Sequence, residues 1–99
     1  MKKENKFQSE LVKELKAMFP GCMVLKNEAN GVTPQGFPDL TVLYKDRWAI
    51  LECKRSANEA HQPNQDIYVE RAEGMSFGSF IYPENKEQVL HDIQRSFED

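Results

Sequence analysis

The chain has 99 residues, of which 39% are hydrophobic and 29% are charged, and its formal net charge is −3. This length predicts one domain over residues 1–99, near the lower limit for a self-sufficient core. The acidic balance argues mildly against nucleic-acid binding, which usually relies on a basic surface. We see no membrane-spanning stretch and no charged-then-apolar leader, so we expect a cytoplasmic protein with no membrane partner.

Hydrophobic periodicity predicts a first helix over residues 4–19, which ends at Pro20-Gly21. A short strand is expected at residues 22–26, followed by a turn-rich loop over residues 27–35. This loop is either a connector or a substrate contact. The two cysteines, Cys22 and Cys53, lie in apolar segments, and we expect buried free thiols rather than a disulfide or a zinc site.

Two apolar, β-branched strands come next, at residues 39–44 and 48–53, with a tight polar turn between them. Further along, a helix is expected from Pro63 to Gly74, a strand over residues 76–82, and a last helix that opens at Pro83. The resulting order is α-β-β-β-α-β-α. The predicted class is α/β, with a mixed sheet flanked by helices.

The hairpin places two acids together if its turn is centred between Lys45 and Asp46. In that register Asp39 faces Glu52, and the β carbons of directly opposed residues lie about 4.5–5.5 Å apart. Lys54 then projects from the same face as Glu52, because alternate residues of a strand share a face. An odd-length turn would send Glu52 to the other face.

Two carboxylates this close repel each other, so one becomes protonated unless a cation lies between them. Magnesium favours such oxygen ligands, completed by water and substrate phosphate. Lys54 beside them can orient a water or stabilise charge on a phosphate. The alternative is that Glu52 and Lys54 form an ordinary solvent-side pair and that Asp39 is a turn residue after Pro38.

The segments GFPDL at residues 36–40 and LECK at residues 51–54 resemble the PD-(D/E)xK signature of restriction-endonuclease-like nucleases. The closer resemblance is to the virus-type replication-repair nuclease (VRR-NUC) family, in which a loop and a Gln, here Gln65, follow the second strand. The resemblance covers nearly the whole chain and implies a restriction-endonuclease-like fold. One departure is Cys53, where such proteins more often carry Val or Ile.

The resemblance implies a magnesium-dependent endonuclease that hydrolyses DNA phosphodiesters, with manganese as a substitute and no organic cofactor. Asp39, Glu52 and the Cys53 carbonyl would hold the metal. Nucleases of this kind often take a third acid from the first helix, and Glu10 matches that placement better than Glu14.

The implied catalytic residues are completed by Lys54 and by Gln65, which would position substrate or the attacking water. Gln62 is the nearest competitor for that second role. The groups expected to contact DNA are Lys54, Arg55, His61 and Gln62, with Lys45 and Arg47 of the hairpin turn expected to flank the site.

Small stand-alone members of the family look structure-selective for branched DNA such as four-way junctions or flaps, and they often act as homodimers. A bacterial or phage-infected cell would suit so compact a chain. A dimer interface is expected around Phe77, Phe80 and Tyr82 or on the last helix. The alternatives are a nonspecific nicking nuclease and a DNA-binding subunit that does not cut.

Overall fold

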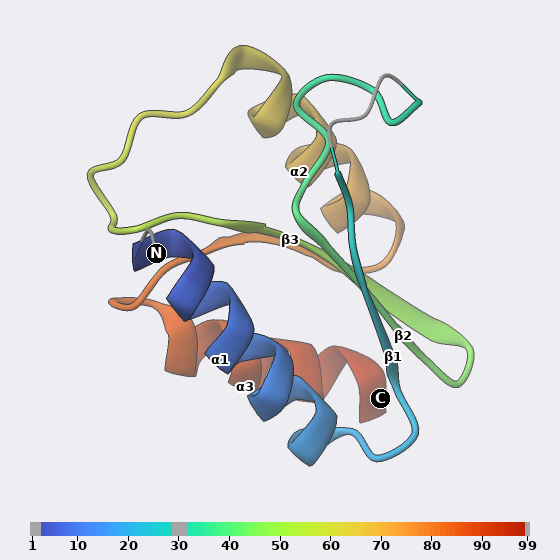
Figure 1. Cartoon of the computed structure of the whole chain (residues 1–99). Coiled ribbons are helices and arrows are strands. Elements are labelled where there is room, and N and C mark those ends of the chain that lie inside the picture. Colours follow the sequence, from blue (N-terminus) through green and yellow to red (C-terminus); the bar gives the residue numbers. More distant parts are fainter. Residues whose placement is uncertain (1–2, 29–31, 99) are drawn as a thin grey trace.

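Residues 3–28 and 32–98, which the computed structural model describes, form three helices and four strands. The α-β-β-β-α-β-α order confirms the order expected from the sequence (Figure 1). None of the helices in these ranges combines the length and the apolar character needed to cross a bilayer. The elements in chain order are α1 (Lys3–Met18), β1 (Met23–Lys26), β2 (Leu40–Tyr44), β3 (Arg47–Cys53), α2 (Pro63–Met75), β4 (Gly78–Ile81) and α3 (Lys86–Glu98).

The four strands form one mixed sheet in the order β1-β2-β3-β4. β1 with β2 and β2 with β3 are antiparallel, whereas β3 and β4 are parallel, with α2 in the connection between them. The β2–β3 ladder runs from Tyr44↔Arg47 to Leu40↔Leu51, which confirms the expected register. A two-residue turn achieves this with Lys45 at a positive φ of 56°, a conformation that such tight hairpin turns require.

One face of the sheet packs against α1 and α3, and this layer holds the hydrophobic core (Figure 1). The helices contribute apolar residues spaced three or four apart, which form a single stripe on each helix. Alternate residues of the strands complete the layer, because one face of each strand is turned toward these helices. The core includes Leu11, Leu15, Phe19, Leu40, Val42, Ala49, Leu51, Cys53, Ile81, Val89, Leu90, Ile93 and Phe97.

α2 covers the other face of the sheet and packs against β3 and β4. The close approach depends on Gly78, because a β carbon there would lie 2.5 Å from the Val69 carbonyl oxygen and 2.8 Å from the Ala72 β carbon. Glu52 belongs to this α2 face, since it alternates with the core residues Leu51 and Cys53. The first turn of α2 is thereby brought to the end of β3.

Two expected boundaries were wrong. β4 begins at Gly78 rather than at residue 76, because the Ser76 N–H donates to the Ala72 carbonyl and ends α2. α3 begins at Lys86 rather than at Pro83, because the side chain of Asn85 accepts the Tyr82 N–H at 2.8 Å and holds a turn. Cys22 and Cys53 are free thiols, as expected, but only Cys53 is fully buried, whereas Cys22 is half-buried.

Candidate active site

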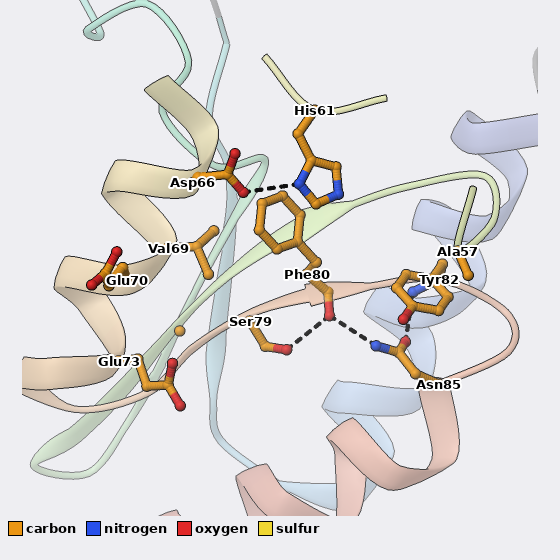
Figure 2. A pocket seen from close by; sticks show the side chains of 11 residues that line it. Ala57, His61, Asp66, Val69, Glu70, Glu73, Ser79, Phe80, Tyr82 and Asn85 are labelled. Atoms are coloured by element: carbon orange, nitrogen blue, oxygen red, sulfur yellow. Dashed lines mark hydrogen bonds and ion pairs between the residues drawn. The ribbon is translucent and has the colours of Figure 1, made fainter. Parts of the chain in front are cut away.

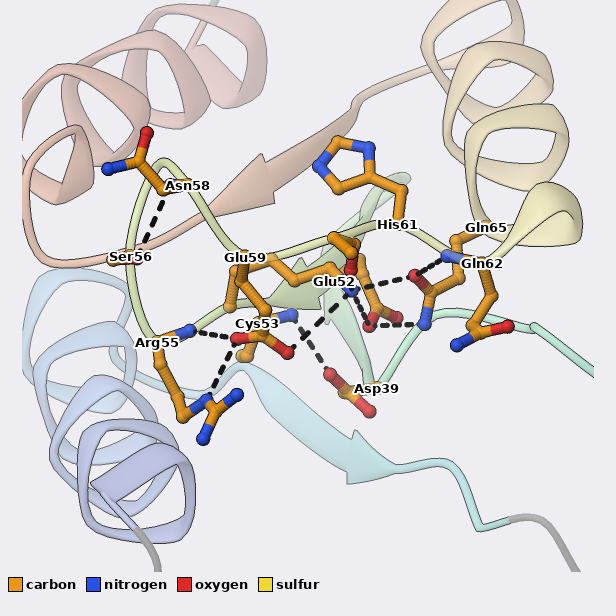
Figure 3. Close-up of polar contacts among 12 residues, drawn as sticks. Asp39, Glu52, Cys53, Arg55, Ser56, Asn58, Glu59, His61, Gln62 and Gln65 are labelled. Atoms are coloured by element: carbon orange, nitrogen blue, oxygen red, sulfur yellow. Dashed lines mark hydrogen bonds and ion pairs between the residues drawn. The ribbon is translucent and has the colours of Figure 1, made fainter.

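Asp39 lies directly before β2, at the open end of the hairpin (Figure 3). Its Oδ2 accepts a hydrogen bond from the backbone N–H of Cys53 at 2.9 Å. On the other side, the Asn27 N–H donates to the Asp39 carbonyl at 2.7 Å, and the Asn27 side chain donates to Thr41 Oγ1 at 3.0 Å. Asp39 is therefore held between β1 and β3, which is the position that the register predicts.

Beside Asp39, the buried side chains of Glu52 and Lys54 form a polar cluster with the half-buried Gln65. Figure 3 shows Asp39, Glu52 and Gln65 of this region. Gln65 Nε2 donates to Glu52 Oε2 at 3.0 Å, while Lys54 Nζ donates to Gln65 Oε1 at 2.7 Å. Lys54 Nζ lies 3.9 Å from Glu52 Oε2. Because Glu52 and Lys54 are each only 3% exposed, the alternative of an ordinary solvent-side pair is wrong.

Further contacts fix the ammonium group of Lys54. It donates to the Ala60 carbonyl at 3.1 Å and lies 4.0 Å from Glu59 Oε2. Glu59 is itself anchored by the Arg55 backbone N–H at 2.6 Å, and this hydrogen bond is the main reason why the pKa of Glu59 is lowered. The loop after β3 therefore folds back over Lys54 and keeps its charge compensated.

Burial raises the pKa of Asp39 above its ordinary value. The Cys53 N–H, a hydrogen bond with Glu52 and the charge of Lys54 oppose this shift, whereas the charge of Glu59 adds to it. Both carboxylates line one cavity, and a divalent cation bound between them would relieve their repulsion.

A cavity of about 200 Å³ opens beside Asp39 and Glu52, and Gln65 forms part of its wall. Glu28 also lines this cavity, although the sequence interpretation did not single it out. The available signal was its position two residues past the end of β1, next to the strand that Asp39 precedes. The loop after β1 therefore lies beside the site, as expected.

The donor chemistry of this cavity suits a hard divalent cation. Asp39 and Glu52 supply two carboxylates to it, and magnesium is usually held by one or two carboxylates together with waters and substrate oxygens. Within the described ranges, no three His, Cys, Asp or Glu side chains are grouped closely enough to hold a metal. The remaining ligands would be waters, substrate oxygens and the expected Cys53 carbonyl.

The structure does not bring the acids of α1 to this pair. α1 packs on the opposite face of the sheet, and Glu10 lines a separate hollow together with Pro83 and Lys86. Glu14 forms an ion pair with Lys86 at 2.9 Å. The role of Glu10 as a metal ligand therefore stays a prediction with no support from this geometry.

Two of the residues expected to contact DNA, Arg55 and His61, lie in different surroundings. Arg55 is largely exposed and pairs with Glu59 at 3.3 Å. His61 stacks on Phe80 with ring centroids 4.0 Å apart, and its Nδ1 lies 2.9 Å from Asp66 Oδ1 (Figure 2). His61 therefore faces a hollow other than the one beside the two acids.

The hairpin turn does not flank the site, contrary to expectation. Lys45 follows the last residue of β2, whereas Asp39 precedes the first, so the turn lies at the opposite end of the hairpin. Arg47 instead donates to the Ser96 carbonyl of α3 at 3.1 Å. The error came from treating neighbours in the sequence as neighbours in space.

Comparison with protein-family models, with curated proteins and with solved structures finds no match to this chain. The resemblance to VRR-NUC nucleases thus depends on the motif residues alone. Membership of that family is a proposal, which the geometry of Asp39, Glu52, Lys54 and Gln65 supports.

Proposed function

We propose that the chain is a magnesium-dependent DNA endonuclease with a restriction-endonuclease-like fold, of the VRR-NUC kind. The observation that carries this proposal is the convergence of Asp39, Glu52, Lys54 and Gln65 at one end of β2 and β3. These residues come from two strands and a helix, and the two acids and Gln65 open onto one polar cavity. The same set carries the sequence resemblance.

Each residue has a role that its contacts support. Asp39 and Glu52 would hold the metal, which when bound supplies a Lewis acid and lowers the pKa of a water. Lys54, held by Gln65 and by the Ala60 carbonyl, presents a fixed positive charge that can offset charge developing on the phosphate. Gln65 keeps Glu52 and Lys54 in place and borders the cavity in which substrate would lie.

A subunit that binds DNA without cutting it fits this arrangement less well. A buried ion pair such as Lys54–Glu52 contributes little net stability, and replacing it with apolar residues is often neutral or stabilising. A binding subunit would gain nothing from keeping these two buried charges beside a second carboxylate, that of Asp39. A role in catalysis would explain why these charges are present, whereas their contribution to stability would not.

We further propose branched DNA as the substrate and a homodimer as the working unit, so that two sites meet two strands. The expected interface, around Phe77, Phe80 and Tyr82 or on the last helix, stays a prediction; the apolar face of that helix is buried in the core of the same chain through Val89, Leu90, Ile93 and Phe97. The large apolar side chains found exposed in the described ranges are Met23, Leu25, Val32, Ile67 and Met75. Light scattering at micromolar concentration tests the dimer, and a mass near 11.5 kDa would contradict it.

Incubation of the purified protein with supercoiled, linear and four-way-junction DNA tests the activity. We expect cleavage with magnesium, none in EDTA, and the fastest cleavage on the junction. Equal rates on all three DNAs would favour the nonspecific nicking nuclease. Binding without cleavage at any magnesium concentration would favour the non-cutting subunit and contradict the proposal.

A further inference from the structure

A second hollow, of about 350 Å³, adjoins the catalytic cavity. Gly36 and Gln65 line both, so the two hollows are neighbours that share these residues as part of their walls. The walls carry no charged side chain and are dominated by carboxamides. The lining residues, which we call the amide groove, are Gln35, Gly36, Gln62, Pro63, Asn64 and Gln65.

The two sides of the amide groove are joined by close packing. Gly36 has a φ of +84°, and a β carbon there would lie 2.5 Å from the Asn64 β carbon. Asn64 Nδ2 donates to the Gln35 carbonyl at 3.2 Å, which fastens the loop before β2 to the first turn of α2. Asn64 and the backbone of Gln35 are therefore held together, and Gln65, which also lines the groove, is bonded to Glu52 and Lys54.

The opposite side of α2 differs in charge. The hollow that His61 faces is lined by Asp66, Glu70 and Glu73, whose carboxylates would repel DNA phosphates (Figure 2). The walls of the amide groove carry no charged side chain, and the groove shares Gly36 and Gln65 with the cavity beside Asp39. A DNA strand that leaves the catalytic cavity thus meets less electrostatic resistance along the amide groove.

We propose that the amide groove binds the nucleotide next to the scissile phosphate through uncharged hydrogen bonds to its base and sugar. This inference rests on the proposed endonuclease function and assigns to Gln35 and Asn64 a role in substrate binding. A carboxamide has two N–H donors and an acceptor oxygen, and Asn and Gln are well suited to base edges. Gln65 is bonded to Glu52 and Lys54, and Asn64 uses one N–H on the Gln35 carbonyl, so the groups offered to the nucleotide are the exposed Gln35 carboxamide and the rest of the Asn64 carboxamide. Such contacts supply affinity without positive charge, which agrees with a chain whose net charge is −3.

The test uses Gln35→Ala, which removes an exposed carboxamide but keeps the backbone carbonyl that Asn64 bonds. Gln35→Glu is nearly the same size and adds a negative charge. Gln94→Ala, an exposed glutamine on α3, is the matched control. A labelled four-way junction is titrated in calcium to measure Kd, and cleavage in magnesium gives KM and kcat.

We expect Gln35→Ala to raise Kd and KM about three- to tenfold, as loss of one or two neutral hydrogen bonds would. Its kcat stays at the wild-type value, and so does the slope of log Kd against log salt, because no phosphate contact is lost. Gln35→Glu weakens binding further, whereas Gln94→Ala matches the wild type. Asn64→Ala, whose folding is checked by its melting temperature, shows the same rise in KM.

Unchanged Kd and KM in both Gln35 variants, with the wild type cutting normally, would contradict the proposed role of the amide groove in substrate binding. The proposed endonuclease activity would be unaffected by that result. A fall in kcat with KM unchanged would also contradict that role of the amide groove, because such a result indicates support of the catalytic residues rather than substrate binding. A wild type that binds the junction without cutting it contradicts the proposed endonuclease activity. The Kd values of the variants then still test whether the amide groove binds DNA. A wild type that binds no DNA contradicts both.

Discussion

Replacing Lys54 with Met removes a buried charge while keeping most of the apolar stem. In the wild type the ammonium is 3.9 Å from Glu52 Oε2 and donates to Gln65 and to the Ala60 carbonyl. Without it, Glu52 is left as a carboxylate that is 97% removed from solvent, with Gln65 Nε2 as a donor. Breaking one side of a buried pair costs about 3–5 kcal/mol. We therefore expect the free energy of unfolding of Lys54→Met to fall by that amount.

The double variant Lys54→Met, Glu52→Gln separates this electrostatic effect from lost packing. Neutralising Glu52 removes the uncompensated charge, so we expect the double variant to regain about 1–3 kcal/mol over Lys54→Met, as coupled neighbours do. Urea unfolding at pH 7 in EDTA measures all four members of the cycle, and equal m-values show that the unfolded states are comparable. For a chain of this size, 3 kcal/mol corresponds to a fall in Tm of about 12–24 °C.

Two results would refute this reasoning. A loss below about 0.5 kcal/mol in Lys54→Met would place the pair in the range of exposed ion pairs, contrary to the burial described above. Additive single effects would mean that Lys54 and Glu52 do not interact, and Lys54 would then be positioned by its hydrogen bonds to Gln65 and the Ala60 carbonyl without the charge of Glu52.

Three further predictions concern the acid pair, the hairpin turn and the metal. Burial raises the pKa of Asp39 in the folded protein, so above the unfolded pKa of about 3.9 ionised Asp39 lowers the free energy of unfolding of the metal-free protein. Asp39→Asn should therefore have a higher free energy of unfolding than the wild type at pH 7 in EDTA. Urea unfolding should show that this difference vanishes below the unfolded pKa. A gain that is constant with pH would contradict the assignment. Lys45→Gly should stabilise the chain by about 1 kcal/mol in the same assay, because glycine adopts the positive φ of 56° without strain; destabilisation would mean that Lys45 makes a needed contact. Calcium, which takes more ligands than magnesium, should support DNA binding but not cleavage in parallel gel-shift and nicking assays, and full cleavage in calcium would contradict the metal assignment.

The sequence predicted the hairpin because strand register follows from the length of the turn and from the alternation of side chains between the two faces of a strand. The two-residue turn at Lys45 aligned Leu40 with Leu51, and the position of Asp39 beside the Cys53 N–H followed. The bond between Gln65 and Lys54 could not be derived from spacing, since it depends on where α2 packs. Only the resemblance pointed to Gln65.

Some expectations gain no support from this geometry, because sequence proximity says little about which face of a sheet an element covers. Glu10 was expected beside the acids, but the apolar stripe of α1 directs that helix to the opposite face. His61 lies close to Lys54 in the chain, yet its ring stacks on Phe80 and contacts Asp66, on the side of α2 that carries the acidic residues. Glu28 was missed because an acid in a polar loop has no periodic signal.

The most direct test of the central claim compares two asparagine substitutions on the same hairpin. Asp39→Asn changes the proposed metal ligand, and Asp46→Asn changes a highly exposed acid at the opposite end. With magnesium and four-way-junction DNA, we predict that Asp46→Asn cuts at the wild-type rate and that Asp39→Asn, although folded, cuts no faster than the EDTA blank. Cleavage by Asp39→Asn at the wild-type rate would contradict the account.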